Sequence, residues 1–133
     1  MKKLFLSSLL MLGLFTLVLS CSKNKGPDGD TGSFNVSDFE VSNIIKEVNS
    51  STNVHVSYDF KNISSRNYSS INGGTSFRIE WTVRTTDGNS FQQNDLLPLE
   101  LNAGATSAEV TNIAISAGKT PDLSTVTYRV YKD

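Results

Sequence analysis

The chain has 133 residues, of which 38% are hydrophobic and 19% are charged, and its formal net charge is −1. This near balance of charge excludes the strongly basic surface typical of nucleic-acid-binding domains, so no nucleic acid partner is expected. A single cysteine excludes an internal disulfide, and with a single histidine it leaves no usual zinc cluster. We therefore expect neither a metal site nor a cofactor.

The first predicted element is a secretory signal peptide over residues 1–20. Two lysines precede an apolar run at residues 4–19, and the small Ser20 stands directly before Cys21. A basic start, an apolar stretch and a small residue before a cleavage point are typical of such signals. Two other interpretations stay open. One is an ordinary signal peptidase site that leaves Cys21 a free thiol, and the other is a transmembrane anchor, although the run is shorter than the ~20 apolar residues that a span needs.

Residues 17–21, Leu-Val-Leu-Ser-Cys, resemble the lipobox of bacterial lipoproteins. The resemblance implies cleavage before Cys21, a diacylglyceryl thioether on the Cys21 thiol and acylation of the freed amine, for example with palmitate. Several acyl chains hold a protein on a membrane stably, whereas one does not. Ser22 resembles the residue that permits sorting to the outer membrane. The expected location is the envelope of a Gram-negative bacterium, at its outer membrane, with the covalent lipid as the membrane contact.

A tether is predicted next, over residues 21–33. Residues 22–33 carry no apolar side chain to bury, and glycine recurs at Gly26, Gly29 and Gly32. The triplets look like the collagen-like stalks of some bacterial lipoproteins, but a triple helix needs many more repeats. A flexible spacer is the expectation, with a reach of up to roughly 37 Å if it is fully polyproline-like.

Beyond the tether, apolar residues at every second position predict an all-β domain over residues 34–133. The clearest strands cover residues 54–60 and 77–84, and the turn at residues 87–89, Asp-Gly-Asn, predicts a hairpin into Phe91. The residues expected to point inward from these two strands are Val54, Val56, Tyr58, Phe60, Phe77, Ile79, Trp81 and Val83.

Four further strands are less regular. Residues 97–101 form a leucine run, residues 110–115 a run with a bulge expected at Asn112, and residues 126–130 a terminal strand. The stretch at residues 42–53 is interpreted as strand because β-branched residues, Ser and Asn dominate it. Before it, a change of parity predicts a break near Ser37 and Asp38.

About seven strands in roughly 100 residues predict an antiparallel immunoglobulin-like β-sandwich, with a small closed barrel as the alternative. Residues 59–65, 81–88 and 101–107 resemble the plan of bacterial immunoglobulin-like envelope modules, similar to the FxLYD and cell-adhesion-related domains. Those stretches hold an Asn-Ser turn, a hairpin with an Asp-Gly tip and a leucine strand that leads to a Gly turn. The resemblance implies a fold more than a function, since sandwiches host many roles.

His55, Ser57 and Asp59 have the residue types of a hydrolase triad. On one strand face they lie side by side roughly 7 Å apart, whereas triad members hydrogen-bond within about 3.2 Å. A polar face is the expected role, and no catalytic residue is predicted. Arg78, Glu80 and Arg84 are expected to be cross-strand charge partners on an exposed face.

The longest polar connection, residues 63–75, carries Arg66 and Tyr68, which we predict as partner-binding residues because sandwiches present such groups on end loops. The favoured function is a lipid-anchored, non-catalytic module that binds an envelope protein or glycan, or helps to assemble a surface complex. The alternative is a small hydrolase or inhibitor at the membrane surface.

Overall fold

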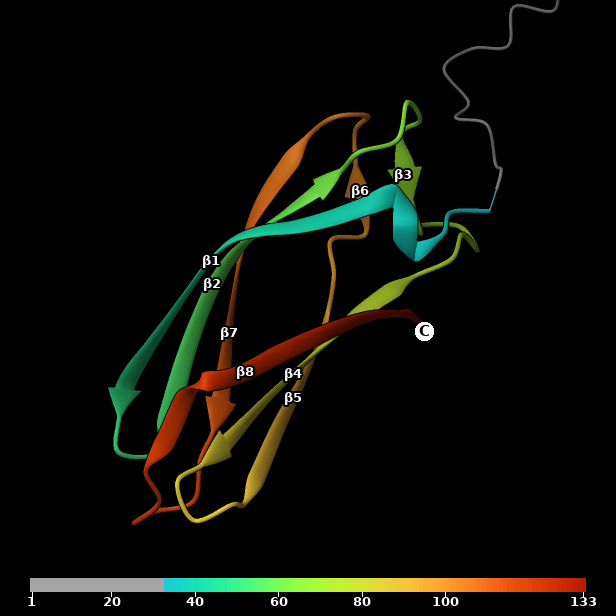
Figure 1. Cartoon of the computed structure of the whole chain (residues 1–133). Helices are drawn as coiled ribbons and strands as arrows, with labels where there is room; N and C mark the ends of the chain where they lie inside the picture. The colour runs from blue at the N-terminus through green and yellow to red at the C-terminus, as the bar shows by residue number, and fades with distance from the viewer. Residues whose placement is uncertain (1–32) are drawn as a thin grey trace, which may run out of the picture.

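The computed structural model describes residues 33–133, which form eight antiparallel strands and one short 3-10 helix (Figure 1). The described part of the chain contains no α-helix, so the prediction of an all-β antiparallel fold is confirmed. The elements are η1 (Val36–Asp38), β1 (Phe39–Ser50), β2 (Asn53–Asn62), β3 (Tyr68–Ser69), β4 (Phe77–Thr85), β5 (Ser90–Leu96), β6 (Glu100–Leu101), β7 (Thr106–Ala114) and β8 (Pro121–Lys132).

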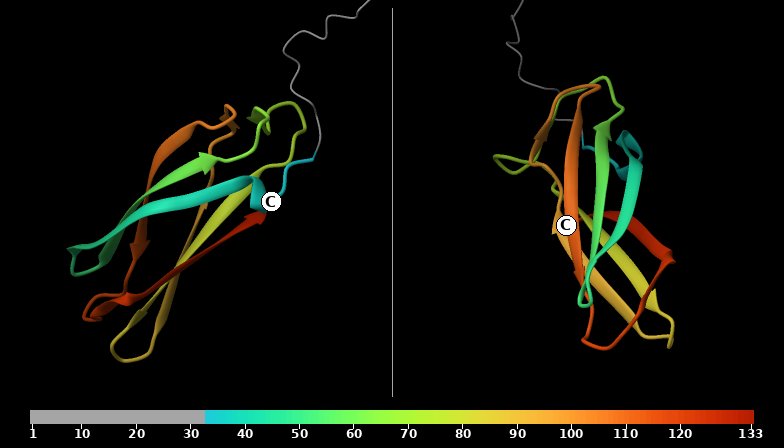
Figure 2. Two further views of the ribbon diagram at one scale, coloured as in Figure 1. Left: turned by 45° about the horizontal axis from the view of Figure 1, so that its top comes forward. Right: turned by 90° about the vertical axis from the view of Figure 1, so that its left-hand side faces the viewer.

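Two three-stranded sheets enclose the core. One has the order β1-β2-β7 and the other β5-β4-β8, while β3 and β6 form a separate two-stranded pair. Figure 1 and the left view of Figure 2 show the two larger sheets as layers that face each other. The central strands β2 and β4 supply most of the fully buried side chains. The core therefore lies between these two strands.

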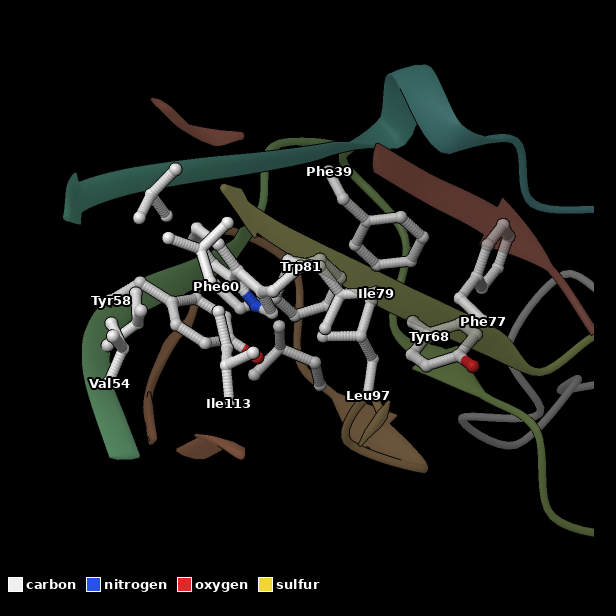
Figure 3. Packing of buried hydrophobic residues seen from close by; sticks show 14 of the residues in the cluster. Phe39, Val54, Tyr58, Phe60, Tyr68, Phe77, Ile79, Trp81, Leu97 and Ile113 are labelled. Carbon is white, nitrogen blue, oxygen red and sulfur yellow. The ribbon is translucent and has the colours of Figure 1, made fainter. Parts of the chain in front are cut away.

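The strict alternation of β2 and β4 produces this core. Buried positions alternate with partly exposed ones along both strands, and every residue predicted to point inward from them is buried. Trp81 is fully buried near the centre, beside Tyr58 (Figure 3). The predicted hairpin is also confirmed, because Gly88 adopts a φ of 87° in the turn and β4 pairs with β5. A positive φ of this size is readily available only to glycine.

The start of the domain follows the prediction of a strand with a break. The break at Ser37 and Asp38 is the 3-10 helix η1, and the stretch at residues 42–53 is largely strand β1. Within β1 the pairing with β2 shifts between Ser42 and Ile45, where Asn43 has a φ of 51°. This bulge reverses which side chains face the core, so that Lys46 takes an inward register position opposite the buried Val56.

The bulge predicted at Asn112 is wrong. Strand β7 pairs with β2 without interruption, from Asn53 opposite Ala114 to Lys61 opposite Thr106. Thr111 is therefore an inward residue with 2% exposure, and Val110 points outward with 56% exposure. The bulge is predicted from the uneven spacing of the apolar residues Val110, Ile113 and Ile115, but the two-residue period of the strand holds throughout and places Val110 on the outer side.

The fourth predicted strand, residues 97–101, is also much shorter in the structure. Only Glu100 and Leu101 pair, with β3, and Leu99 is 45% exposed. Pro98 lies inside the predicted run and has no N–H to contribute to a ladder. Strand β3 of this short pair therefore lies in the polar connection at residues 63–75, and β6 lies at the end of the predicted strand at residues 97–101.

The two ends of the described domain differ. Near Ser33, where the described chain begins, Lys132 Nζ donates to Ser33 Oγ over 3.4 Å, and the pair β3–β6 lies at this same end. The three turns β1–β2, β4–β5 and β7–β8 gather at the opposite end, where Ile115 N donates to Thr52 O over 2.8 Å and Thr86 N to Thr120 O over 2.9 Å. We call these the entry end and the turn end.

Candidate functional site

The predicted lipidation site Cys21 lies outside the described residues 33–133. The predicted partner-binding residues Arg66 and Tyr68 both lie at the entry end, in the connection between β2 and β4. The structure gives these two residues different surroundings.

Arg66 lies partly exposed over the first residues of the domain. Its guanidinium carbon is 4.5 Å from the centre of the Phe34 ring, and its Nη2 lies 3.7 Å from Asp38 Oδ2. Both members of the ion pair keep about a quarter of their side-chain surface exposed. Such a pair contributes little to stability, about 0–1 kcal/mol. A guanidinium held in this way can still meet an acidic or aromatic group of a partner.

Tyr68 is a core residue. It is 2% exposed, and its ring lies 5.0 Å from Phe39 and 5.7 Å from Phe77, measured between ring centres (Figure 3). Its hydroxyl donates to Thr75 O over 3.0 Å, which fixes the far side of the loop. Burial raises the pKa of the Tyr68 hydroxyl. Within the described domain its contacts are therefore those of packing, and of the two predicted residues Arg66 alone offers surface to a partner.

Asn62 is the residue that shapes this loop, and the sequence indicates it only as part of an Asn-Ser turn, without a functional role. Its fully buried side chain donates to Arg66 O over 2.7 Å and to Leu101 O over 3.0 Å. Its Oδ1 accepts from Ser64 N over 3.0 Å and from Ser64 Oγ over 2.7 Å. Because both the nitrogen and the oxygen of the Asn62 side-chain amide are hydrogen-bonded, this residue holds the loop against β6. An Asn-x-Ser turn after an alternating strand is the available signal, but such turns are common.

Three exposed apolar side chains accompany Arg66 at the entry end. Ile63 follows β2, and Ile71 and Leu99 lie on the two connections beside β3 and β6. The connections are held together because Ser70 N donates to Leu99 O over 2.8 Å. Scattered apolar residues are normal on a surface, so these three only mark a face on which contact is favourable.

The triad candidates do not converge. His55 Nδ1 lies 3.0 Å from Asn112 Oδ1 on the neighbouring strand, and Asn43 Nδ2 donates to Asp59 Oδ2 over 2.6 Å. His55 and Asp59 are thus hydrogen-bonded to residues outside the trio. All three candidates occupy outward register positions of β2, as the two-residue spacing predicts.

The outer face of the sheet β5-β4-β8 carries the charges predicted to pair across strands. Arg129 Nε donates to Glu80 Oε1 over 2.9 Å, and Arg78 Nε to Asp133 Oδ1 over 2.8 Å. The carboxylates raise the pKa of both guanidinium groups. The predicted charge-pairing role therefore holds for Arg78 and Glu80, with partners on and just beyond β8.

Among residues 33–133, no group of three or more His, Cys, Asp or Glu side chains is arranged to hold a metal ion. No helix in the same range is long and apolar enough to cross a membrane.

One further surface was not visible in the sequence. Strands β1 and β8 are edge strands of different sheets and run along the same side of the molecule, as both views of Figure 2 show. Lys46 Nζ donates to Val126 O over 3.1 Å across this side. We call it the β1/β8 side.

Comparison with known proteins adds no relative: the chain matches no protein-family model, no curated protein and no solved structure.

Proposed function

We propose that this chain is a lipid-anchored lipoprotein of the bacterial cell envelope, whose β domain acts as a non-catalytic binding or assembly module. The observation that carries the proposal is the lipobox-like run ending in Cys21, followed after the twelve residues 22–33 by a β domain whose first residues lie at its entry end. An anchor of this kind would hold the entry end within roughly 37 Å of a membrane, the reach of an extended tether.

The strand order supports the finer assignment of an immunoglobulin-like sandwich. Such sandwiches pair strand B with A and E in one sheet, and strand C with F in the other. Here β2 pairs with β1 and β7, and β4 pairs with β8, which is the same pattern. Strand β5 takes the place of C′ beside C. No described strand takes the place of G beside β8.

Binding is favoured over catalysis by the surroundings of the polar groups. His55 and Asp59 are hydrogen-bonded to Asn112 and Asn43, not to each other or to Ser57. General-base catalysis needs the base within hydrogen-bond reach of the nucleophile. The hydrolase alternative gains no support from this arrangement.

Labelling with palmitate tests the anchor. The full chain is expressed in a Gram-negative bacterium with labelled palmitate, beside Cys21→Ser and the matched control Ser22→Ala. We expect label in the wild type and in the control, recovered with the outer membrane, and none in Cys21→Ser. Label that persists in Cys21→Ser contradicts the anchor.

Capture of partners tests the binding role. Membranes are cross-linked and the full chain is purified together with any bound protein. The variants Arg66→Ala and Arg84→Ala are treated in parallel, and the exposed Arg84 lies near the turn end of β4. We expect the amount of captured partner to fall at least several-fold with Arg66→Ala and to stay unchanged with Arg84→Ala. Equal capture by all three proteins would contradict partner binding through Arg66 at the entry end.

A further inference from the structure

The outward edge of β8 has backbone groups that no described strand pairs. In an antiparallel strand, alternate residues direct their N–H and C=O to opposite sides. Asp133 N donates to Ser76 O over 3.0 Å, so the odd-numbered residues at this end of β8 face β4. Tyr128 and Val130 therefore direct their backbone groups away from the sheet. The bond from Lys46 to the carbonyl of Val126 agrees with this direction.

Apolar side chains that face the core are exposed to solvent along the same edge. Tyr128 lies opposite the fully buried Trp81, in an inward register position, and their ring centres are 5.1 Å apart. Tyr128 is nevertheless 42% exposed, and Val48, inward on the facing strand β1, is 50% exposed. Ile44 and Val130 are only partly buried against the core. An added strand beside β8 would cover these side chains.

The opposite side of the sandwich, between β5 and β7, is closed by polar groups. Asp95 and Gln93 occupy inward register positions on β5, opposite Ile79 and Trp81. Thr111 Oγ1 on β7 donates to Asp95, and Gln93 Nε2 donates to the other oxygen of Asp95 over 2.9 Å. An inward-pointing carboxylate that is already hydrogen-bonded to β7 disfavours pairing of the β5 edge with an added apolar strand. The two sides are thus unequal, and the apolar one is at β8.

The lysines beside the β8 edge indicate which charges an added strand should carry. The two ionisable amines with inward register positions along the β1/β8 side are Lys46 and Lys132. They lie near the two ends of the exposed edge, about 20 Å apart if six residues of strand separate Val126 from Lys132. A second copy of this chain would bring the same two lysines and be repelled. A segment with a carboxylate at each end would be attracted.

From these observations we propose that the β8 edge binds an extended peptide segment of a partner protein as an added strand, with alternate apolar residues facing Tyr128 and Val130 and acidic residues facing Lys46 and Lys132. Main-chain hydrogen bonds to the edge supply affinity, and the alternate side chains supply specificity. The inference deepens the proposed binding role and rests on it.

The test uses a synthetic peptide with blocked ends, Glu-Thr-Val-Thr-Val-Thr-Glu, and a control peptide with lysine at both ends. The full chain is purified in detergent and titrated with each peptide while amide hydrogen exchange is followed by NMR. We expect the glutamate peptide to slow exchange of the Tyr128 and Val130 amides at least tenfold, with little change at Arg129, whose amide already faces β4. We expect the lysine peptide to bind at least tenfold more weakly.

Three variants test the backbone, the side chains and the charges of the edge separately. Val130→Pro removes one outward N–H at an edge where proline is tolerated, and should weaken binding at least tenfold. Val130→Ala keeps this N–H and loses only side-chain contact, so it should weaken binding by no more than about threefold. The pair Lys46→Glu and Lys132→Glu should reverse the preference between the two peptides. Protection at β5 instead of β8, self-association through β8, or no protection in the wild type at millimolar peptide overturns the inference. Partner capture from membranes that succeeds while the peptide fails overturns this inference and leaves the binding role standing.

Discussion

At the scale of single residues, Tyr58 links stability to alkaline pH. Its side chain is buried beside Trp81, and burial raises the pKa of its hydroxyl from 10.0 to about 12, with smaller contributions from Glu109 and Asp95. The folded state therefore holds this proton more tightly than the unfolded state. Stability that depends on Tyr58 is fully present below pH 10 and is lost as pH rises toward 12.

Urea unfolding at a series of pH values checks this. We expect the free energy of unfolding to fall between pH 10 and pH 12, and Tyr58→Phe to fall less steeply because it has no hydroxyl to ionise. Burial also raises the pKa of Tyr68, so the double variant with Tyr68→Phe should show a still flatter dependence. A Tyr58→Phe curve parallel to that of the wild type would contradict the assignment.

Asn62 should be the polar residue on which the entry end depends most. Asn62→Ala leaves two carbonyl groups and the Ser64 amide without the partner they have now. We expect a loss of about 2–3 kcal/mol in the free energy of unfolding, measured in urea. The control Asn112→Ala removes an exposed amide that contacts His55, and should change stability by about 0.5 kcal/mol or less. Equal losses in the two variants would show that burial at Asn62 is not the cause.

At the scale of elements, the central strands could be predicted from the sequence and the edges could not. Strands β2 and β4 alternate strictly because one face of each is fully buried, so their pattern is legible without a structure. Val110 is apolar but exposed, since the face of a strand is assigned by register and not by residue type, and Leu99 is exposed because it lies outside the short strand β6. Tyr68 was predicted as a contact residue because its loop is polar, yet long-range packing on Phe39 and Phe77 buries it. The residues near Tyr68 in the sequence do not indicate such long-range packing.

The link between β5 and β7 also depends on register, and it can be tested. Thr111 donates to Asp95 from the other sheet, so the two sheets are joined by a hydrogen bond to a charged group. Thr111→Val keeps the shape but leaves the inward carboxylate without this donor, which should cost about 1.5–3 kcal/mol in urea unfolding. Thr111→Ser retains the hydroxyl and should recover most of the hydrogen-bond contribution. A valine variant as stable as the serine variant would contradict the importance of the bond.

At the scale of the whole molecule, the positions of the ends predict an orientation on the membrane. The described residues begin with Ser33 at the entry end, and the three turns lie at the turn end. Strand β8, with 12 residues, spans about 40 Å between the two ends. If Cys21 carries lipid, a tether shorter than or similar to this span should keep the entry end nearer to the bilayer on average.

Fluorescence quenching measures this orientation. The only natural cysteine is Cys21, so a second cysteine introduced at Ile71 near the entry end, or at Ser51 in the β1–β2 turn, can be labelled alone once Cys21 is acylated. The lipidated chain is placed in vesicles that contain a headgroup quencher. We expect a label at Ile71→Cys to be quenched more strongly than one at Ser51→Cys, and the difference to vanish for the unlipidated Cys21→Ser protein. Equal quenching of the two labels on the lipidated chain would mean that the tether lets the domain turn freely, and stronger quenching at Ser51→Cys would place the turn end against the membrane.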